Sequence, residues 1–312
     1  MDTNKEKTTT NYKNLKIKRK RKTIKQRLHA LGHWIFYVTM KFFGHKGAYI
    51  LLWPVVGSYV IFSKRIHKIT QIYLKKRFPN KRCYWLDTFK LVHSFSQVLV
   101  DRAWLGLNPK AKFEGKLEGL KTLKKLIAKG KGLILLTAHV GIWQVAFSNL
   151  PDLNVPVNVL MHYEEENAAK HYFDLRNQPC PFHIIRNDGF MGGLIEASAA
   201  LSKGEIVTIM ADRYVHGPYA RVKFLGYETR IPIGAYMLAA ITATPVVVLL
   251  TAKTGKTNYL VKIWDVFYPI CKNRSKKEQE MQKYAQKFID ALEEYLKIYP
   301  YQWYNFYDFW KQ

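Results

Sequence analysis

The hydrophobic and polar positions divide the chain into three stretches of different character. Residues 1–30 are mostly polar and basic, and such a stretch cannot bury enough apolar surface to fold, so a flexible arm is expected there. Residues 31–70 are dominated by aliphatic and aromatic side chains. Residues 71–312 alternate short apolar runs with amphipathic stretches, which predicts one α/β domain.

The apolar segment at 31–70 is expected to be helical and to associate with a membrane. Its densest part, Gly47 to Phe62, reads GAYILLWPVVGSYVIF. This run is shorter than the roughly 20 apolar residues that a spanning helix needs, and Pro54 interrupts it. We expect a hairpin that lies in the interface of a bilayer, next to a basic arm that adheres to anionic headgroups. A buried pair of core helices is the alternative.

The last stretch has the pattern of a layered α/β fold. Short apolar runs are typical of strands, and they occur at 132–137, 155–161, 182–186, 205–210, 245–252 and 259–266. Amphipathic stretches predict helices at 117–129, 141–150, 192–202, 233–242 and 276–298. The alternation predicts a mostly parallel sheet flanked by helices.

The charge of the chain points to an anionic partner. Lys and Arg number 50 against 23 Asp and Glu, a formal net charge of +27, which attracts nucleic acid, an anionic bilayer or an acidic carrier protein. The aromatic content of 14% favours a membrane interface, because amphipathic rings are enriched there. The sequence contains no nucleic-acid recognition motif, so nucleic acid is not an expected partner.

The three cysteines do not suggest a metal centre or a disulfide framework. Cys83, Cys180 and Cys271 are far apart and show no paired ligand spacing. A reducing compartment and a mechanism without metal or cofactor are therefore expected.

A candidate catalyst follows the first buried run. The segment 133–147 reads LILLTAHVGIWQVAF, with His139 two residues after the predicted strand and Gly141 permitting a sharp exit. Ligands of open α/β sheets gather beyond the carboxyl ends of the strands. With an ordinary pKa near 6.5, a histidine there can take a proton from an attacking hydroxyl at neutral pH. A structural histidine that caps the next helix is the alternative.

Basic residues are expected at the same edge of the sheet. Arg186 ends the predicted strand 182–186, and its planar guanidinium suits a phosphate or a developing oxyanion. A surface salt bridge is the alternative. Arg213 and Lys223 belong to a second basic group after the predicted strand 205–210, assigned to a headgroup or carrier contact.

The block TAHVGIWQ resembles the H-x-x-x-x-D/E block of the lysophospholipid acyltransferase superfamily, in particular the late acyltransferases of lipid A biosynthesis. Four further likenesses follow in the family's order. They are ADR at 211–213, VKFLG at 222–226, PIG with TPVV at 232–247, and PYQW at 300–303. Together the blocks cover the chain from about residue 31 to its end.

The resemblance implies a glycerol-phosphate-acyltransferase-like fold and an acyltransferase with His139 as general base. The donor would be a thioester of acyl carrier protein or coenzyme A, and the acceptor a hydroxyl or amine of a lipid such as a lipid A precursor. The implied location is the cytoplasmic face of a Gram-negative inner membrane. A lipid-binding pseudoenzyme and an acyl thioesterase are the alternatives. The expected substrate contacts are Gly141, Trp143, Arg213, Lys223 and Phe224.

One position departs from the family pattern. The acidic partner of the histidine falls at Gln144, whose amide can hold the imidazole tautomer but offers no charge to the imidazolium. Asp212 is the first candidate for a substitute carboxylate, because it follows the predicted strand 205–210 at the same sheet edge. The run Glu164 to Glu166 is the second. The expected catalytic group is therefore His139, Gln144, Asp212 and Arg186.

Overall fold

The computed structural model describes residues 24–108, 110–111, 113–142, 153–161, 182–187 and 190–311. Side chains are described from Leu31 onward, Phe190 and Met191 excepted. The predicted helix at 141–150 lies outside the described residues, apart from its first two positions.

Seven strands form one sheet, and its five strands from β8 to β4 run parallel. The neighbouring β9 is antiparallel to β8, and β1 runs parallel to β9. In spatial order the strands are β1 (Glu114–Glu118), β9 (Asn258–Phe267), β8 (Val246–Lys253), β2 (Leu133–Thr137), β5 (Ile206–Met210), β3 (Val157–Met161) and β4 (His183–Arg186). The predicted α/β fold with a mostly parallel sheet is confirmed, and all six predicted strands are present.

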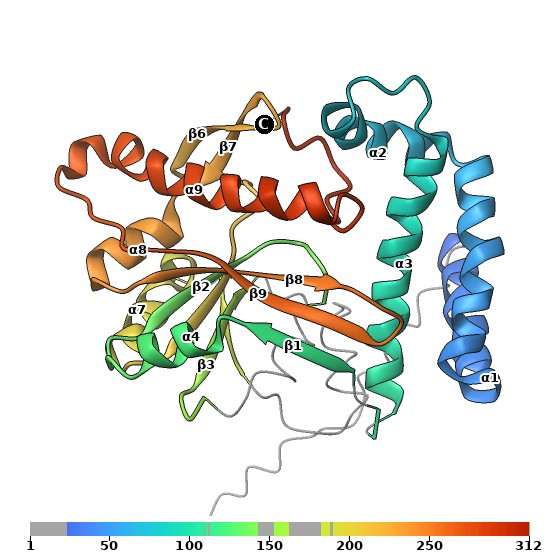
Figure 1. The fold of residues 1–312 in the computed structure, drawn as a ribbon, viewed down its shortest axis with the longest axis horizontal. Helices are drawn as coiled ribbons and strands as arrows, with labels where there is room; N and C mark the ends of the chain where they lie inside the picture. Colours follow the sequence, from blue (N-terminus) through green and yellow to red (C-terminus); the bar gives the residue numbers. More distant parts are fainter. Residues whose placement is uncertain are drawn as a thin grey trace, which may run out of the picture.

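Helices cover both faces of this sheet. In Figure 1, α9 lies across one face and α4 lies on the other. Among the described residues, the helices that flank the sheet are α4 (Leu120–Ile127), α7 (Leu194–Ser202), α8 (Gly234–Thr242) and α9 (Lys277–Ile298), with short 3₁₀ turns at Phe190–Gly193 and Arg274–Lys276. The predicted helix at 117–129 is shorter than expected because β1 takes its first residues and Gly119 adopts φ 99°.

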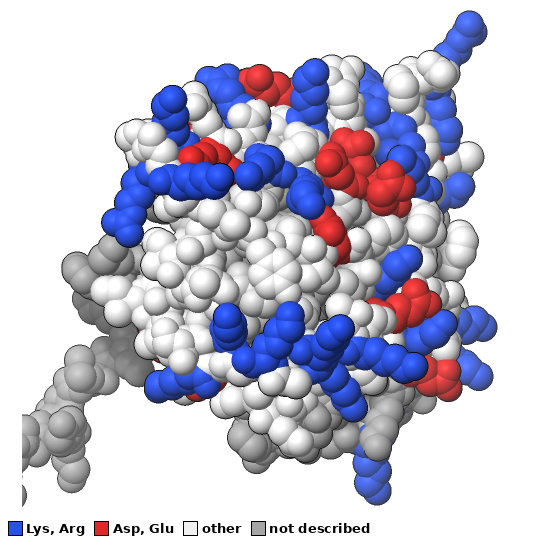
Figure 2. Space-filling model, turned by 60° about the vertical axis from the view of Figure 1, so that its left-hand side comes forward, with Lys and Arg blue, Asp and Glu red and all other residues white. Residues whose placement is uncertain are grey.

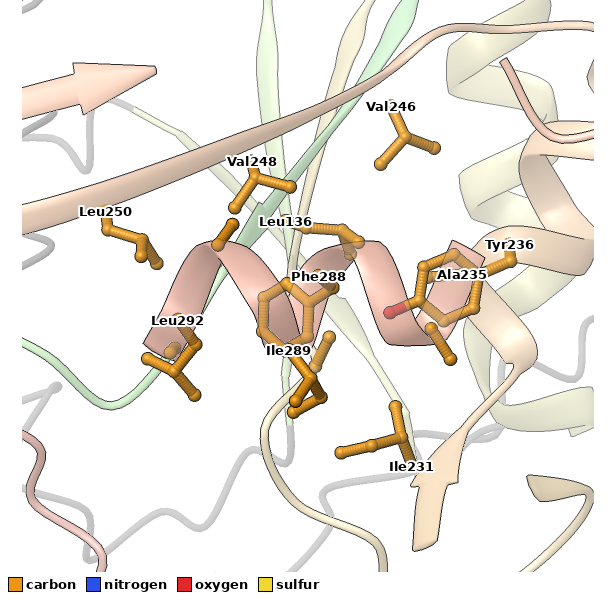
Figure 3. Close-up of a cluster of buried hydrophobic side chains, with 14 of the residues drawn as sticks. Leu136, Ile231, Ala235, Tyr236, Val246, Val248, Leu250, Phe288, Ile289 and Leu292 are labelled. Atoms are coloured by element: carbon orange, nitrogen blue, oxygen red, sulfur yellow. The ribbon is translucent and has the colours of Figure 1, made fainter. Parts of the chain in front are cut away.

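The core explains why β2 is apolar throughout. Ile134 and Leu136 point into the layer of α7, α8 and α9, whereas Leu133 and Leu135 point toward α4. Figure 3 shows the first of these layers, where Leu136 lies among side chains of β8, α8 and α9 such as Phe288. A strand covered on both faces needs apolar side chains at every position. Each such buried side chain contributes about 1.5–3 kcal/mol.

The apolar N-terminal segment forms a helical hairpin. The helix α1 (Ile24–Phe62) is broken at Gly44, where φ is 65° and ψ is −165°. A Cβ placed on Gly47 would lie 3.5 Å from Cγ2 of Thr39, whereas eight residues of continuous helix rise roughly 12 Å. The chain therefore turns back at Gly44, as the expected hairpin requires. The helix begins at Ile24, within the stretch 1–30 for which a flexible arm is expected, and residues 1–23 of that stretch lie outside the described residues.

The hairpin packs on the domain by one side only. Met40, Leu52 and Val60 are buried toward α3 (Trp85–Leu107), which continues from the short helix α2 (Lys64–Arg77) through a loop. Phe42 and Phe62 are 72% and 82% exposed, so the hairpin is not a buried core element. The expected domain boundary at residue 70 falls inside α2.

No single helix among the described residues is long and apolar enough to cross a membrane. The stretch Leu31–Phe62 together with α2 passes on length and composition, and these two helices are bent by 91°.

A buried polar cluster joins the hairpin to the domain. Asp101 of α3 is fully buried, and its Oδ1 accepts hydrogen bonds from His45 Nε2 and Tyr49 OH of α1, both at 2.6 Å. Its Oδ2 accepts from Lys253 Nζ of β8 at 2.6 Å and from Tyr259 OH of β9. Burial alone would raise the pKa of Asp101, but the hydrogen bond from His45 and the charge of Lys253 lower it.

The second sheet is a hairpin of β6 (Tyr219–Phe224) and β7 (Tyr227–Pro232), which the sequence did not predict. It packs beside α9, where Gln286 exchanges two hydrogen bonds of 2.9 Å with the backbone of Lys223. The hairpin is thereby fixed to the helix layer of the domain.

Candidate active site

His139 and Asp212 meet at the carboxyl edge of the parallel sheet. The two residues follow the neighbouring strands β2 and β5, whose last residues, Thr137 and Met210, pair in register. His139 Nδ1 lies 2.7 Å from Asp212 Oδ1, and the backbone N–H of His139 donates to Asp212 Oδ2 at 2.9 Å. Two contacts to one carboxylate fix both the ring and the backbone of the histidine.

The C-terminal tail holds this pair from the other side. Trp303 Nε1 donates to Asp212 Oδ2 at 2.9 Å. Trp303 also forms an antiparallel bridge with Val140, and the backbone N–H of Tyr304 donates to the carbonyl oxygen of His139 at 2.8 Å. The tail therefore adds a short strand-like contact to the loop that carries His139.

The environment of Asp212 keeps it ionised. Burial of the fully enclosed carboxyl would raise the pKa of Asp212, but the charge of His139 and the hydrogen bonds from His139 and Trp303 lower it to about 2. Because an ionised carboxylate only accepts hydrogen bonds, Nδ1 of His139 carries a proton, and in the neutral imidazole Nε2 is therefore the nitrogen that can accept one. The His139 side chain is 25% exposed, so a ligand can approach its ring.

Gly141 allows the loop to pass close to β8. Its φ is 53°, in the left-handed region. A Cβ at this position would lie 2.3 Å from the carbonyl oxygen of Thr251, far inside van der Waals contact. The sharp exit after His139 therefore requires glycine.

The comparisons with known proteins bear on this arrangement. The model of one protein family, described as bacterial lipid A biosynthesis acyltransferase, matches residues 23–312. The chain belongs to this family. The resemblance found in the five sequence blocks is thus confirmed, and the protein is an acyltransferase that acts on lipids.

The structure is similar to the crystal structure of the 1-acyl-sn-glycerophosphate (LPA) acyltransferase PlsC from Thermotoga maritima, at 13% identity and a TM-score of 0.35. The match covers 80% of this chain and 98% of that one. A search of curated proteins gave no match.

The other predicted site residues of the acyltransferase are spread more widely. Trp143, Gln144 and the run Glu164 to Glu166 lie outside the described residues. Arg186 ends β4 at the same sheet edge, but β4 is three strands from β2, roughly 14 Å at the usual strand spacing. It is therefore separate from the His139–Asp212 pair.

The two residues of the second basic group, Arg213 and Lys223, have different surroundings in the acyltransferase. The guanidinium of Arg213 donates to the carbonyl oxygen of Tyr304 at 3.3 Å and lies 5.7 Å from the ring centre of Tyr307. Lys223 is bound through its backbone, and its side chain is exposed. Arg213 thus binds the C-terminal tail through Tyr304, whereas the Lys223 ammonium lies in solvent.

The placement of Phe224 corrects its expected substrate contact. Its side chain is fully buried, and its ring centre lies 5.1 Å from that of Trp303 and 5.5 Å from that of Trp310. The ring centre of Tyr73 of α2 lies 5.1 Å from that of Trp303, in an edge-on contact. Phe224 supports the indole that holds Asp212, and it has no surface for a ligand.

Residues that follow Pro300, within and beyond the PYQW block at 300–303, reach the candidate site. Trp303 contacts Asp212, and Tyr304 contacts the loop that carries His139. Asn305 is 6% exposed, and neither atom of its amide has a hydrogen-bond partner in the structure. Within the described residues, no group of three or more His, Cys, Asp or Glu side chains could hold a metal ion.

Proposed function

We propose that this acyltransferase moves a fatty acyl chain from a thioester of acyl carrier protein or coenzyme A to a hydroxyl or amine of a lipid acceptor, such as a lipid A precursor. His139 acts as the general base. The contact between His139 Nδ1 and Asp212 carries the proposal, because it leaves Nε2 as a free proton acceptor on a partly exposed ring.

The reaction needs no covalent enzyme intermediate. The acceptor oxygen or nitrogen attacks the thioester carbonyl carbon while its proton passes to His139 Nε2. The carbon–sulfur bond then breaks, and the leaving thiolate takes the proton back from the imidazolium. Asp212 stabilises that imidazolium and holds the ring in one tautomer, as in other catalysts built on a carboxylate and a histidine. The oxyanion would be stabilised by backbone amides after Gly141.

The charge of the chain supports an anionic donor or acceptor. The net charge of +27 favours encounter with an acidic carrier protein or with a phosphorylated lipid. Arg213 and Lys223 expose part or all of their side chains beyond the carboxyl end of β5 and on β6, and we assign them to headgroup or carrier contact.

We further propose that the protein works at the cytoplasmic face of the inner membrane, with the α1 hairpin in the bilayer interface. One side of the hairpin packs on α3, and the other exposes large apolar side chains. They are Leu31, Trp34, Ile35, Tyr37, Phe42, Phe43, Ile50, Trp53, Tyr59, Ile61 and Phe62. The adjoining helix α2 has basic residues and no acidic ones, which suits anionic headgroups.

Acyl transfer from labelled thioesters into total bacterial lipid tests the reaction. Carrier-protein and coenzyme A donors are compared, and the product mass identifies the acceptor. His139→Ala is expected to abolish the labelled lipid, whereas His216→Ala, an exposed histidine after β5, keeps the rate. Full transfer by His139→Ala would overturn the proposal. Release of free fatty acid without acylated lipid would make the protein a thioesterase.

Binding to vesicles tests the location. The triple change Phe42→Ser, Phe43→Ser and Phe62→Ser removes exposed apolar rings worth about 1.5–3 kcal/mol each when buried in a membrane. Partitioning onto anionic vesicles is expected to fall by about a hundredfold or more. Ile298→Ser also replaces an exposed apolar side chain by serine, but on α9, away from the hairpin. It serves as the control and should bind vesicles normally. Unchanged partitioning of the triple variant would refute the assignment.

A further inference from the structure

Arg102 of α3 is a partly buried cation that the proposed reaction does not use. Among the residues that the structure describes, its guanidinium takes part in no hydrogen bond and no ion pair. Burial lowers the pKa of Arg102, and no charged or hydrogen-bonding neighbour in the described part of the chain raises it. Arg77 and Arg230 are also partly buried, but the first donates to a backbone carbonyl and the second lies over a tyrosine ring.

A cation without a counter-charge is costly where it is removed from water. Basic side chains avoid this cost at the surface. On the face drawn in Figure 2, Lys and Arg side chains project from the molecule, and several stand beside Asp or Glu. The side chain of Arg102 is mostly covered instead. An anion bound beside its guanidinium would offset the cost.

The position of Arg102 on α3 directs it toward the loop after β2. Val98 and Leu105 lie four residues before and three residues after it, so the three share one face of the helix. Val98 and Leu105 are buried in one cluster with Ile142 and Tyr304. Ile142 belongs to the loop that carries the proposed base, and the backbone N–H of Tyr304 donates to that loop. The face of α3 that carries Arg102 therefore adjoins the candidate site.

Aromatic side chains of the tail extend this contact along α3. Figure 1 shows α3 between the α1 hairpin and the sheet. Phe95, seven residues before Arg102 and on the same face, has its ring centre 5.2 Å from that of Tyr304 and 5.0 Å from that of Phe306. Because helical side chains lean toward the N-terminal end of their helix, Arg102 covers the turn next to these rings. Tyr304 also contacts His139, so Arg102 is a neighbour of the His139–Asp212 pair and not part of it.

We propose that Arg102 binds a phosphate group of a substrate. A planar guanidinium can bind two phosphate oxygens at once, and apolar surroundings strengthen the attraction. Since Tyr304 and Ile142 lie between α3 and the base, the phosphate belongs to a part of the substrate away from the reacting carbonyl. This step rests on the proposed function, in which two substrates can carry such a group. They are the thioester donor, through the phosphopantetheine arm, and a phosphorylated lipid acceptor.

Two pairs of ligands that each differ by one phosphate test the site. The first pair is phosphopantetheine and pantetheine, and the second is monoacylglycerol phosphate and monoacylglycerol in micelles of a neutral detergent. Their binding to the full-length protein is measured by titration calorimetry. The unaltered protein is expected to bind the phosphorylated member of a pair more tightly. Arg102→Gln should reduce that preference by about tenfold or more, because hydrogen bonds to a charged group are lost.

Matched variants separate a ligand-binding role from a structural one. Arg102→Lys keeps the charge and should retain part of the preference. Arg274→Gln changes an exposed arginine before α9 and should bind both pairs like the unaltered protein. Removal of an unpaired, partly buried cation should leave the urea midpoint of Arg102→Gln unchanged or raise it. A lower midpoint would mean that Arg102 stabilises the fold, and the proposal would be wrong.

The pair in which Arg102→Gln loses the preference identifies the source of the phosphate. A loss in the first pair assigns it to the donor, and a loss in the second pair assigns it to the acceptor. The absence of any phosphate preference in the unaltered protein, or an equal preference in Arg102→Gln, would overturn the proposal. Binding is measured without transfer, so it can fail or succeed independently of the His139→Ala result. In the transfer assay, Arg102→Gln should raise KM for the same substrate by about tenfold or more and leave kcat within about threefold.

Discussion

Replacing Asp212 by asparagine keeps the shape of a fully buried side chain and removes its charge. In the folded protein the pKa of this carboxyl is lowered from its ordinary 3.8 to about 2. Two pKa units correspond to about 2–3 kcal/mol of folding stability that is present above pH 4 and lost as the pH falls through 2, because only the unfolded chain then takes up the proton readily. Asp212→Asn should therefore lower the free energy of unfolding at neutral pH by about 2 kcal/mol.

The effect of this change on catalysis should be larger. An asparagine can turn its N–H toward Nδ1 of His139, and the ring proton then moves to Nε2, where the base is needed. General-base assistance by a histidine typically contributes about 10²–10⁴-fold in rate, and we expect kcat to fall by that amount. Initial rates of labelled acyl transfer at saturating donor measure it. Asp290→Asn, on the exposed side of α9, is the matched control.

Urea denaturation of the same preparations separates the two effects. A stability loss near 2 kcal/mol leaves the protein folded at assay temperature, so a fall in kcat is then a catalytic effect. The gap in stability between the unaltered protein and Asp212→Asn should narrow as the pH is lowered from 4 toward 2. If Asp212→Asn is folded and its rate falls by no more than about threefold, the loss is far smaller than expected. Asp212 then does not assist His139 as general base.

Three further changes test the surroundings of the site. Trp303→Phe removes the indole donor to the Asp212 carboxylate and should cost about 1.5–3 kcal/mol in urea denaturation, with a smaller fall in kcat than Asp212→Asn. Asp101→Asn leaves the Lys253 ammonium buried without its counter-charge and should cost about 3–5 kcal/mol in the same assay. Asn305→Leu removes a buried amide without hydrogen-bond partners and should raise the free energy of unfolding by about 1 kcal/mol, measured in urea.

The sheet could be predicted where its strands are buried on both faces. Runs such as LILLT at 133–137 have apolar side chains on both sides, and their length is that of a buried strand and is short for a helix. The strand β1 was missed because its sequence, EGKLE, is charged at three of five positions, as an edge strand of the sheet allows. The β6–β7 hairpin was missed because its turn, Leu225-Gly226, is not one of the common hairpin pairs, although both residues have positive φ.

That His139 and Asp212 lie close together could be predicted, because parallel strands bring their carboxyl ends to one edge. Position alone left open whether His139 is catalytic or structural, and only the family resemblance favoured the catalytic role. His139 and Asp212 are 73 residues apart, and the sequence departs from its family at Gln144. The expectation that Asp212 lies near His139 holds in the structure. The indole of Trp303, a further 91 residues along the chain, could not be placed, because a tail without regular structure has no periodicity from which to infer its contacts.

The same tail connects the His139–Asp212 pair to the apolar α1 hairpin through hydrogen bonds. The ammonium of Lys253 donates a hydrogen bond to Asp101. The backbone of Lys253 exchanges two hydrogen bonds of 2.8 Å with the side-chain amide of Gln302. Gln302 precedes Trp303, which donates to Asp212. Since Asp101 also holds His45 of α1, the hairpin, the sheet and the catalytic loop share one continuous set of polar contacts. Each contact joins segments far apart in the sequence, and together they fix the distance between the apolar hairpin and His139, which an enzyme with one lipid-borne substrate must keep constant.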